Sequence, residues 1–167
     1  MTAGPAGSLV RSDVRDAWSQ HPERTGGMAR SIGVDLGARR IGVAVSDAAG
    51  SMAFPRPPIA RRPQRSGDHR AIAEVAEELG AEVVVVGLPL SLDGSRGRAA
   101  RAAEEEAAVL STLLAPRGVR VETFDERFTT VTADASLASA GVAGRARRGR
   151  VDSAAAAVLL QSWLDSR

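Results

Sequence analysis

The sequence has no cysteine, no lysine and only two histidines among its 167 residues. Without cysteine, the chain can form no disulfide, no thiolate nucleophile and no cysteine-based zinc site. His21 and His69 are too few for a histidine-rich metal centre, and their polar, loop-like surroundings predict two solvent-exposed side chains. Any metal chemistry must therefore use carboxylates, which favour hard ions such as Mg²⁺ or Mn²⁺.

Long hydrophobic stretches are also missing. No run reaches the roughly 18 apolar residues of a membrane span, and the start of the sequence lacks the apolar segment of a secretory signal. We therefore expect a cytoplasmic protein with no membrane association. Residues 1–28 are rich in Gly, Ser, Pro and charge and predict a flexible N-terminal extension, with Met28 as an alternative start. Residues 29–167 have the length of one domain.

The positive charge comes entirely from 22 arginines, and the net charge of +2 conceals an uneven distribution. Residues 31–70 carry seven arginines against three acids, and residues 127–167 carry six against three. Residues 71–126 carry five arginines against eleven acids. Basic segments around an acidic middle suit a polyanionic ligand. A GC-rich genome is the simpler explanation for the use of arginine in place of lysine.

The hydrophobic pattern predicts a β-β-β-α-β-α-β-α-α order. A tight turn joins the first two strands into an antiparallel hairpin, and the later β-α-β-α-β crossovers make the remaining strands parallel. We expect an α/β fold, with a mixed five-stranded sheet and helices on both faces. The expected strands are 31–37, 40–47, 51–55, 82–87 and 119–124, the helices 68–79, 98–115, 129–140 and 151–165, and the loops 56–65, 88–97 and 141–149.

Acidic residues stand at three unusual places in this pattern. Asp35 lies within an apolar strand, where an unpaired carboxylate is costly to bury. Asp125 and Glu126 follow a core strand, where open α/β sheets bind their ligands, but only one of the two can readily face Asp35. Asp152 falls in the first turn of the last helix. Turn or helix capping would explain each acid separately. Together, three carboxylates can hold two divalent ions about 4 Å apart for phosphodiester hydrolysis.

Two loops add candidate phosphate contacts. Four arginines precede Asp152 and would grip a phosphodiester backbone, although most such charge runs are only solvated loops. The four are Arg145, Arg147, Arg148 and Arg150. Gly94 and Ser95 belong to a glycine-rich loop that opens a helix and would offer backbone N–H groups to an anion. An ordinary strand-to-helix connection explains that loop about as well.

Four segments of the sequence resemble signature blocks of the YqgF (RuvX) family. They are GVDLGARRIGVAVSD, VVVVGLPLSLDGSRG, DERFTT and VDSAAAAVLLQSWLD, in the family's order. The resemblance covers residues 30–165 and implies an RNase H-like nuclease domain. Basic positions around the last loop, often mixed Lys and Arg in relatives, are all Arg here.

The resemblance also implies an activity, a metal-dependent endonuclease that matures the 5′ end of pre-16S ribosomal RNA, with ribosome association. Asp35, Glu126 and Asp152 then serve as catalytic residues and as ligands of Mg²⁺ or Mn²⁺. The nucleic-acid-binding arginines would be Arg39, Arg40, Arg96, Arg127, Arg145, Arg147, Arg148 and Arg150, and Gly94 and Ser95 would form a phosphate loop.

Three other functions compete with this one. A Holliday junction resolvase in DNA recombination would use the same carboxylates on branched DNA. A non-catalytic, nucleic-acid-binding transcription factor would need the arginines but not the acids. An ATPase of the actin type also uses a D-x-G strand and hairpin, but such proteins join two domains around the nucleotide and this chain has room for one.

Overall fold

The computed structural model describes residues 30–128 and 145–167, and the side chains of these residues except Phe128 and residues 145–152. The expected N-terminal extension, at residues 1–28, and the expected helix at 129–140 lie outside the described residues.

Five strands form one sheet in the order β3-β2-β1-β4-β5. Their bounds are β1 (Ser31–Leu36), β2 (Arg40–Ser46), β3 (Ala53–Ala60), β4 (Val83–Leu88) and β5 (Arg120–Asp125). β1 pairs antiparallel with β2 and parallel with β4, β2 pairs antiparallel with β3, and β4 pairs parallel with β5. The predicted mixed sheet, with an antiparallel hairpin beside parallel strands, is confirmed.

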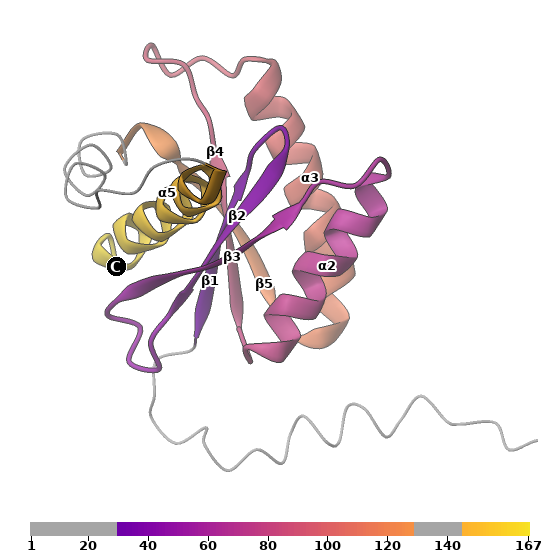
Figure 1. The fold of residues 1–167 in the computed structure, drawn as a ribbon, viewed down its shortest axis with the longest axis vertical. Coiled ribbons are helices and arrows are strands. Elements are labelled where there is room, and N and C mark those ends of the chain that lie inside the picture. The colour runs from indigo at the N-terminus through magenta and orange to yellow at the C-terminus, as the bar shows by residue number, and fades with distance from the viewer. Residues whose placement is uncertain (1–29, 129–144) are drawn as a thin grey trace, which may run out of the picture.

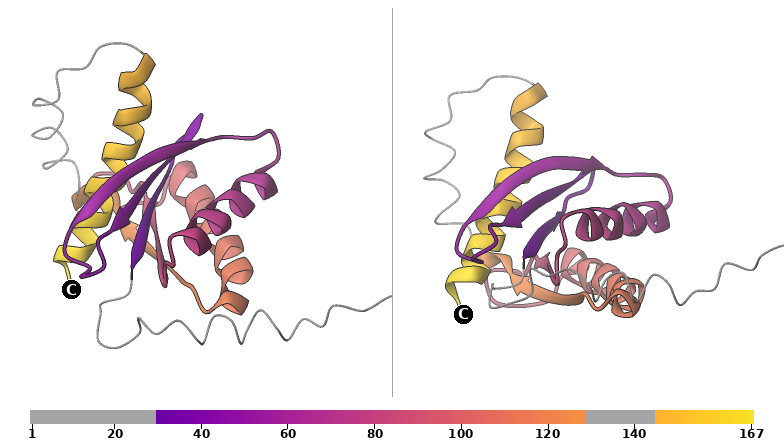
Figure 2. Two further views of the ribbon diagram at one scale, coloured as in Figure 1. Left: turned by 60° about the horizontal axis from the view of Figure 1, so that its bottom comes forward. Right: turned by 90° about the horizontal axis from the view of Figure 1, so that it is seen from below.

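Helices cover both faces of this sheet, as predicted (Figure 1). α2 (Arg65–Glu78) and α3 (Arg98–Leu114) lie together on one face, and α5 (Arg145–Asp165) crosses the other (Figure 2). Two short 3-10 turns complete the described elements, η1 (Ala115–Arg117) and η2 (Glu126–Phe128).

Alternation along the strands builds a separate core on each face. In β1, Ile32 and Val34 are buried against the α2 and α3 side, together with Ile72 and Leu110. On the other face, α5 buries Leu160 and Trp163 against β2 and β4. Gly33 of β1 lies on this second face because neighbouring strand residues point to opposite sides. The two cores therefore fix β1, the strand that carries Asp35, from both sides.

Three element boundaries differ from the sequence prediction by three or more residues. β3 continues to Ala60 through a segment expected to be a loop, since an edge strand tolerates prolines that a central strand would not. α2 begins at Arg65, and α5 begins at Arg145, within the expected loop 141–149. The arginines at 145–150 therefore lie in the first turns of a helix, for which arginine has a high propensity.

Among the helices that the structure describes, none combines the length and the apolar character needed to cross a bilayer.

Candidate active site

The candidate site lies at the edge of the sheet where the parallel strands β1, β4 and β5 all have their carboxyl ends. Val34 of β1 pairs with Val86 of β4, and Gly87 of β4 pairs with Phe124 of β5. Asp35, one residue beyond Val34, therefore lies level with Gly87. Glu126 follows the end of β5 at the same level. The register brings both acids to one edge, on either side of β4.

Gly87 leaves the space in which Glu126 lies. A Cβ atom built on Gly87 would come within 3.0 Å of Cδ of Glu126 and would overlap its Oε1. The Glu126 side chain thus crosses β4, the strand between β1 and β5, at Gly87, which is the one residue of β4 without a side chain. Neighbouring strands are about 4.8 Å apart, so this crossing brings the Glu126 carboxylate towards the Asp35 side of the sheet.

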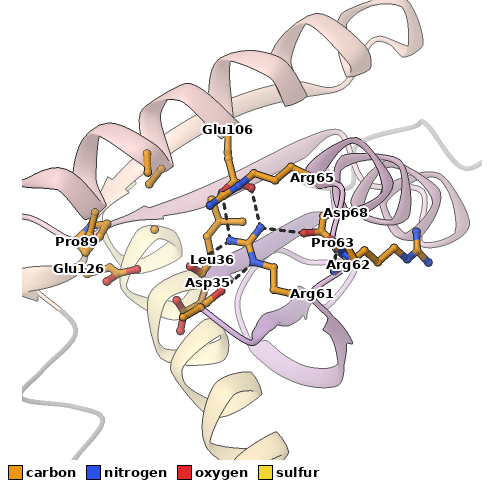
Figure 3. A pocket seen from close by; sticks show the side chains of 16 residues that line it. Asp35, Leu36, Arg61, Arg62, Pro63, Arg65, Asp68, Pro89, Glu106 and Glu126 are labelled. Carbon is orange, nitrogen blue, oxygen red and sulfur yellow. Dashed lines mark hydrogen bonds and ion pairs between the residues drawn. The ribbon is translucent and has the colours of Figure 1, made fainter.

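Asp35 and Glu126 line a common cavity of about 470 Å³. Both carboxylates lie at one side of it, and Arg61 and Glu106 lie at another (Figure 3). Both acids are only partly exposed. The cavity gives a small polar ligand access to two carboxylates at once.

The pKa of Glu126 reflects its burial and the nearby carboxylates. Burial, followed by the negative charges of Asp35 and Asp125, raises the pKa of Glu126 to about 7. A pair of close carboxylates opposes ionisation unless a cation compensates the charge. The arrangement therefore favours a bound cation.

Asp125, the alternative to Glu126, has a different partner. Its Oδ2 accepts hydrogen bonds from Nη2 (2.6 Å) and Nε (2.9 Å) of Arg127, and its Oδ1 accepts one from the Arg127 backbone N–H (2.9 Å). These bonds, with that to the Arg127 side chain as the largest cause, hold the pKa of Asp125 below its usual value. The structure thus places Glu126 with Asp35 and gives Asp125 an ion pair.

Asp152 belongs to α5, and its side chain lies outside the described residues. Further along the helix, at Ala156 and Leu160, α5 packs closely on β1. A Cβ atom on Gly33 would be 2.8 Å from Cβ of Leu160 and 2.9 Å from the carbonyl oxygen of Ala156. Ser153 donates a hydrogen bond to the carbonyl oxygen of Arg56 in β3 (2.6 Å). The residues with described side chains contain no cluster of three potential metal ligands, so a third carboxylate would have to come from elsewhere.

Four of the eight predicted nucleic-acid-binding arginines have described side chains. Arg39 is exposed in the β1–β2 turn, and Arg40 is half-buried at the start of β2. Arg96 pairs with Glu104 (3.0 Å), and Arg127 pairs with Asp125 as described above. The remaining four are Arg145, Arg147, Arg148 and Arg150, which begin α5 and whose side chains are outside the described residues.

The expected phosphate loop is closed by bonds within itself. The Gly94 N–H donates to the carbonyl oxygen of Ser91 (2.7 Å), and the Ser95 N–H donates to Oδ1 of Asp93 (2.8 Å). Gly94 has a φ of +82°, which favours glycine. In this conformation neither amide is available to an anion, so an anion here would have to meet side chains such as Arg96.

A buried ionic cluster beside the site was missed by sequence reasoning. Arg61, Asp68 and Glu106 come from the end of β3, from α2 and from α3, and ion pairs join them. His69, predicted to be on the surface, is 7% exposed and has Nε2 3.3 Å from Oε2 of Glu106. That prediction is wrong because the surrounding segment forms the buried first turns of α2. The signal in the sequence was the position of Asp68 and His69 in the first turn of the helix expected at 68–79.

Comparison with known proteins places this geometry in a family. The family model described as "RuvX: Holliday junction resolvase" matches residues 29–166. A protein of Mycobacteroides abscessus named "Putative pre-16S rRNA nuclease" is 44% identical over 91% of this chain and 93% of its own length. One of the same name from Rhodococcus jostii is also 44% identical, over 91% of this chain and 88% of its own length.

Solved structures show the same fold. RuvC of Thermus thermophilus, solved in complex with a Holliday junction substrate, superposes with a TM-score of 0.55 at 18% identity, covering 84% of this chain and 96% of RuvC. The yeast mitochondrial Holliday junction resolvase Ydc2 gives 0.53 at 10% identity, covering 81% of this chain and 78% of Ydc2. The fold is thus the RNase H-like fold of these resolvases. On the sequence matches, the chain belongs to the RuvX family.

Proposed function

We propose that the protein is a metal-dependent endonuclease that hydrolyses phosphodiester bonds in the 5′ maturation of pre-16S ribosomal RNA. The observation that carries the proposal is the meeting of Asp35 and Glu126 over Gly87, in one cavity at the carboxyl edge of the sheet. The names of the relatives support ribosomal RNA as the substrate. The activity would take place in the cytoplasm, on precursor particles of the ribosome.

The donor set fits a hard divalent cation. Asp35 and Glu126 offer carboxylate oxygens, and the pKa of Glu126 is raised by burial and then by the negative charges of Asp35 and Asp125, which a bound cation would offset. Asp35, Glu126 and Asp152 would hold Mg²⁺ or Mn²⁺, in a site of one or two ions. Such an ion activates water and stabilises the charge on the leaving oxygen.

The remaining parts of the site would bind and orient the strand. Arg39 is exposed on the turn directly after Asp35, and Arg96 lies just before α3, whose first turns line the cavity. Guanidinium groups bind phosphate bidentately, and such contacts set the register of a nucleic acid without reading its bases. The arginines at the start of α5 would extend the same contact surface past Asp152.

A Holliday junction is the second candidate substrate, because the matching family model is described by that activity. Both substrates contain phosphodiesters, and the carboxylates would treat either backbone alike. The choice between RNA and branched DNA therefore depends on contacts beyond the two acids.

A cleavage assay tests both candidates together. Wild type, Asp35→Asn and Asp47→Asn would be incubated with a pre-16S RNA precursor and with a four-way DNA junction, in Mg²⁺ or Mn²⁺. Asp47 is a matched control because it follows β2, at the opposite edge of the sheet, and bonds Ser51. We expect wild type and Asp47→Asn to cut the precursor and Asp35→Asn to be inactive.

Other outcomes would change the proposal. Cleavage of the junction alone would assign the resolvase function. Equal cutting by Asp35→Asn and wild type would exclude this site. Binding that survives the loss of the carboxylates, without cleavage by any variant, would indicate the non-catalytic module.

A further inference from the structure

Arg61 bonds the backbone immediately after Asp35. Its Nε donates to the carbonyl oxygen of Gly37 (2.9 Å), and its Nη2 donates to that of Leu36 (3.4 Å). The Arg61 backbone N–H also donates to the carbonyl oxygen of Arg39 (3.0 Å). Arg61, which directly follows β3, therefore bonds three carbonyl oxygens in and beside the β1–β2 turn.

Two buried carboxylates hold the Arg61 guanidinium in this position. Nη1 donates to Oδ2 of Asp68 (3.1 Å) and to Oε2 of Glu106 (2.9 Å), and Nη2 donates to Oε1 of Glu106 (3.2 Å). The side chains of Arg61, Asp68 and Glu106 are 14%, 0% and 6% exposed. Burial disfavours the charge of Arg61, but the bonds to Glu106 and Asp68 outweigh it and raise its pKa.

Every N–H of the Arg61 side chain has an acceptor. A guanidinium has five such donors in a fixed planar fork, and the two carbonyl oxygens and three carboxylate contacts account for all five. Arg61 consequently has no donor left for a substrate phosphate, unlike the exposed Arg39. The cluster around it also joins the β1–β2 turn to α2 and α3 (Figure 3).

We propose that Arg61 is a positioning residue: anchored by Asp68 and Glu106, it fixes the Leu36–Gly37 backbone and so holds Asp35 at the distance from Glu126 that cation binding requires. The structural part stands on the contacts above, and its consequence for cleavage rests on the proposed function. Arg61 acts through Asp35 and does not touch the substrate.

Hydrogen exchange tests the structural part without any activity. Arg61→Lys keeps the positive charge but replaces the planar fork by a single ammonium. We expect the Gly37 N–H, which donates to the carbonyl oxygen of Asp35 (3.0 Å), to exchange at least tenfold faster in this variant. Arg62→Lys is the matched control, because Arg62 is exposed and its Nη1 bonds Gly67 outside the cluster. Equal exchange of Gly37 in wild type and Arg61→Lys would overturn the proposal.

Mn²⁺ titration and steady-state kinetics test the functional part. Arg61→Lys should weaken Mn²⁺ binding and lower kcat about tenfold or more, with KM changed less than threefold. A rise in KM at unchanged kcat would show that Arg61 binds phosphate and would contradict the positioning role. If wild type cuts no nucleic acid at all, the proposed function fails, while the exchange and Mn²⁺ measurements still decide the role of Arg61.

A second variant guards against loss of folding in Arg61→Lys. Glu106→Gln keeps the shape of the side chain that anchors Arg61 but removes its charge, and Glu105→Gln changes the exposed neighbour in the same way. We expect Glu106→Gln to speed Gly37 exchange and weaken Mn²⁺ binding in the same direction as Arg61→Lys, and Glu105→Gln to match wild type. If Glu106→Gln left both Gly37 exchange and Mn²⁺ binding as in wild type, the proposed anchoring of Arg61 by Glu106 would be overturned.

Discussion

Gly87 is as specific to the candidate site as the two acids that meet over it. Asp35 and Glu126 come from strands on either side of β4, and any side chain at position 87 would occupy the space of the Glu126 carboxylate. The residue type at position 87 is therefore constrained by the neighbouring Glu126 carboxylate as well as by the fold of the sheet.

Replacement of Gly87 by alanine tests this constraint. The new Cβ would push the Glu126 carboxylate away from Asp35, and a displacement of about 1 Å at a catalytic group can cost on the order of 100-fold in rate. We expect a 10- to 100-fold lower rate of cleavage, measured under single-turnover conditions. Gly97→Ala is the control, because a Cβ there has only Oγ of Ser91 nearby, at 3.9 Å. Equal rates for Gly87→Ala and Gly97→Ala would show that Glu126 needs no such space.

The sequence predicted the acids of the candidate site but not the residues that surround them. An aspartate inside an apolar strand and a glutamate after a core strand stand out in a linear pattern. Arg61 does not, because Glu106 is 45 positions away in sequence and joins Arg61 and Asp68 only when α2 and α3 pack together. The same packing buries His69, whose charged neighbours Asp68 and Arg70 favoured a surface position.

The position of α5 depends on the small size of one strand residue, Gly33 of β1. Gly33 lets the helix approach β1 so closely that a Cβ would overlap the Leu160 side chain and the Ala156 backbone. Because Asp152 lies one turn before Ala156, this contact also sets where α5 begins relative to Asp35.

Gly33→Ala should therefore destabilise the protein. Extra atoms in a packed core typically cost about 1–3 kcal/mol, and the helix backbone cannot yield as a flexible side chain would. Urea unfolding of wild type and variant measures the difference, which we expect in that range, together with reduced Mn²⁺ binding. A variant as stable as wild type would mean that α5 shifts on β1 at no cost.

The turn after β2 makes a separate prediction for pH. Asp47 accepts hydrogen bonds from Oγ and N–H of Ser51 (both 2.7 Å), and the bond to the Ser51 side chain is the largest cause of its lowered pKa. A carboxyl whose pKa is lowered by folding stabilises the protein above its unfolded pKa and loses that effect as pH falls through the folded value. Asp47→Asn should thus be less stable at pH 7, with the difference shrinking below about pH 4. A difference that is constant with pH, measured by thermal unfolding, would contradict this.

Strands and helices were predictable where a single residue pattern, apolar for a strand or helix-favouring for a helix, dominates the segment. β1, β2 and β4 followed from apolar runs, and α3 from an alanine- and glutamate-rich segment that ends before Pro116. β3 was cut short because Pro55, Pro57 and Pro58 indicate a loop unless the strand is known to lie at an edge. The start of α5 was set too late because the glycines within 141–149 favour a loop, although the arginines there favour a helix.

The charge distribution of the whole molecule bears on substrate binding. The basic segments at 31–70 and 127–167 supply the exposed Arg39 turn and the start of α5, whereas the acidic middle includes Glu106, which is buried in the Arg61 cluster, and Glu126 at the site. A net charge of +2 thus averages basic segments, which we predict to contact the substrate, with acids that lie in the Arg61 cluster and at the candidate site.

Neutralising the start of α5 tests that surface. Replacing Arg145, Arg147, Arg148 and Arg150 by glutamine should weaken binding of the RNA precursor. Its salt dependence should flatten by about 0.7 in log–log slope for each phosphate that the variant no longer neutralises. Mn²⁺ affinity should stay close to that of wild type. A collapse of Mn²⁺ affinity would instead assign these residues a structural role, and an unchanged salt slope would remove them from the contact surface.

We propose that Asp35 and Glu126 form one cation site at the carboxyl edge of the sheet. Anomalous scattering from crystals grown with Mn²⁺ locates such an ion without reference to any substrate. We expect an anomalous peak bound by carboxylate oxygens of Asp35 and Glu126, beside Gly87, and no such peak in crystals of Asp35→Asn. Mn²⁺ bound only elsewhere in the wild type, or a peak at this site that persists in Asp35→Asn, would contradict it.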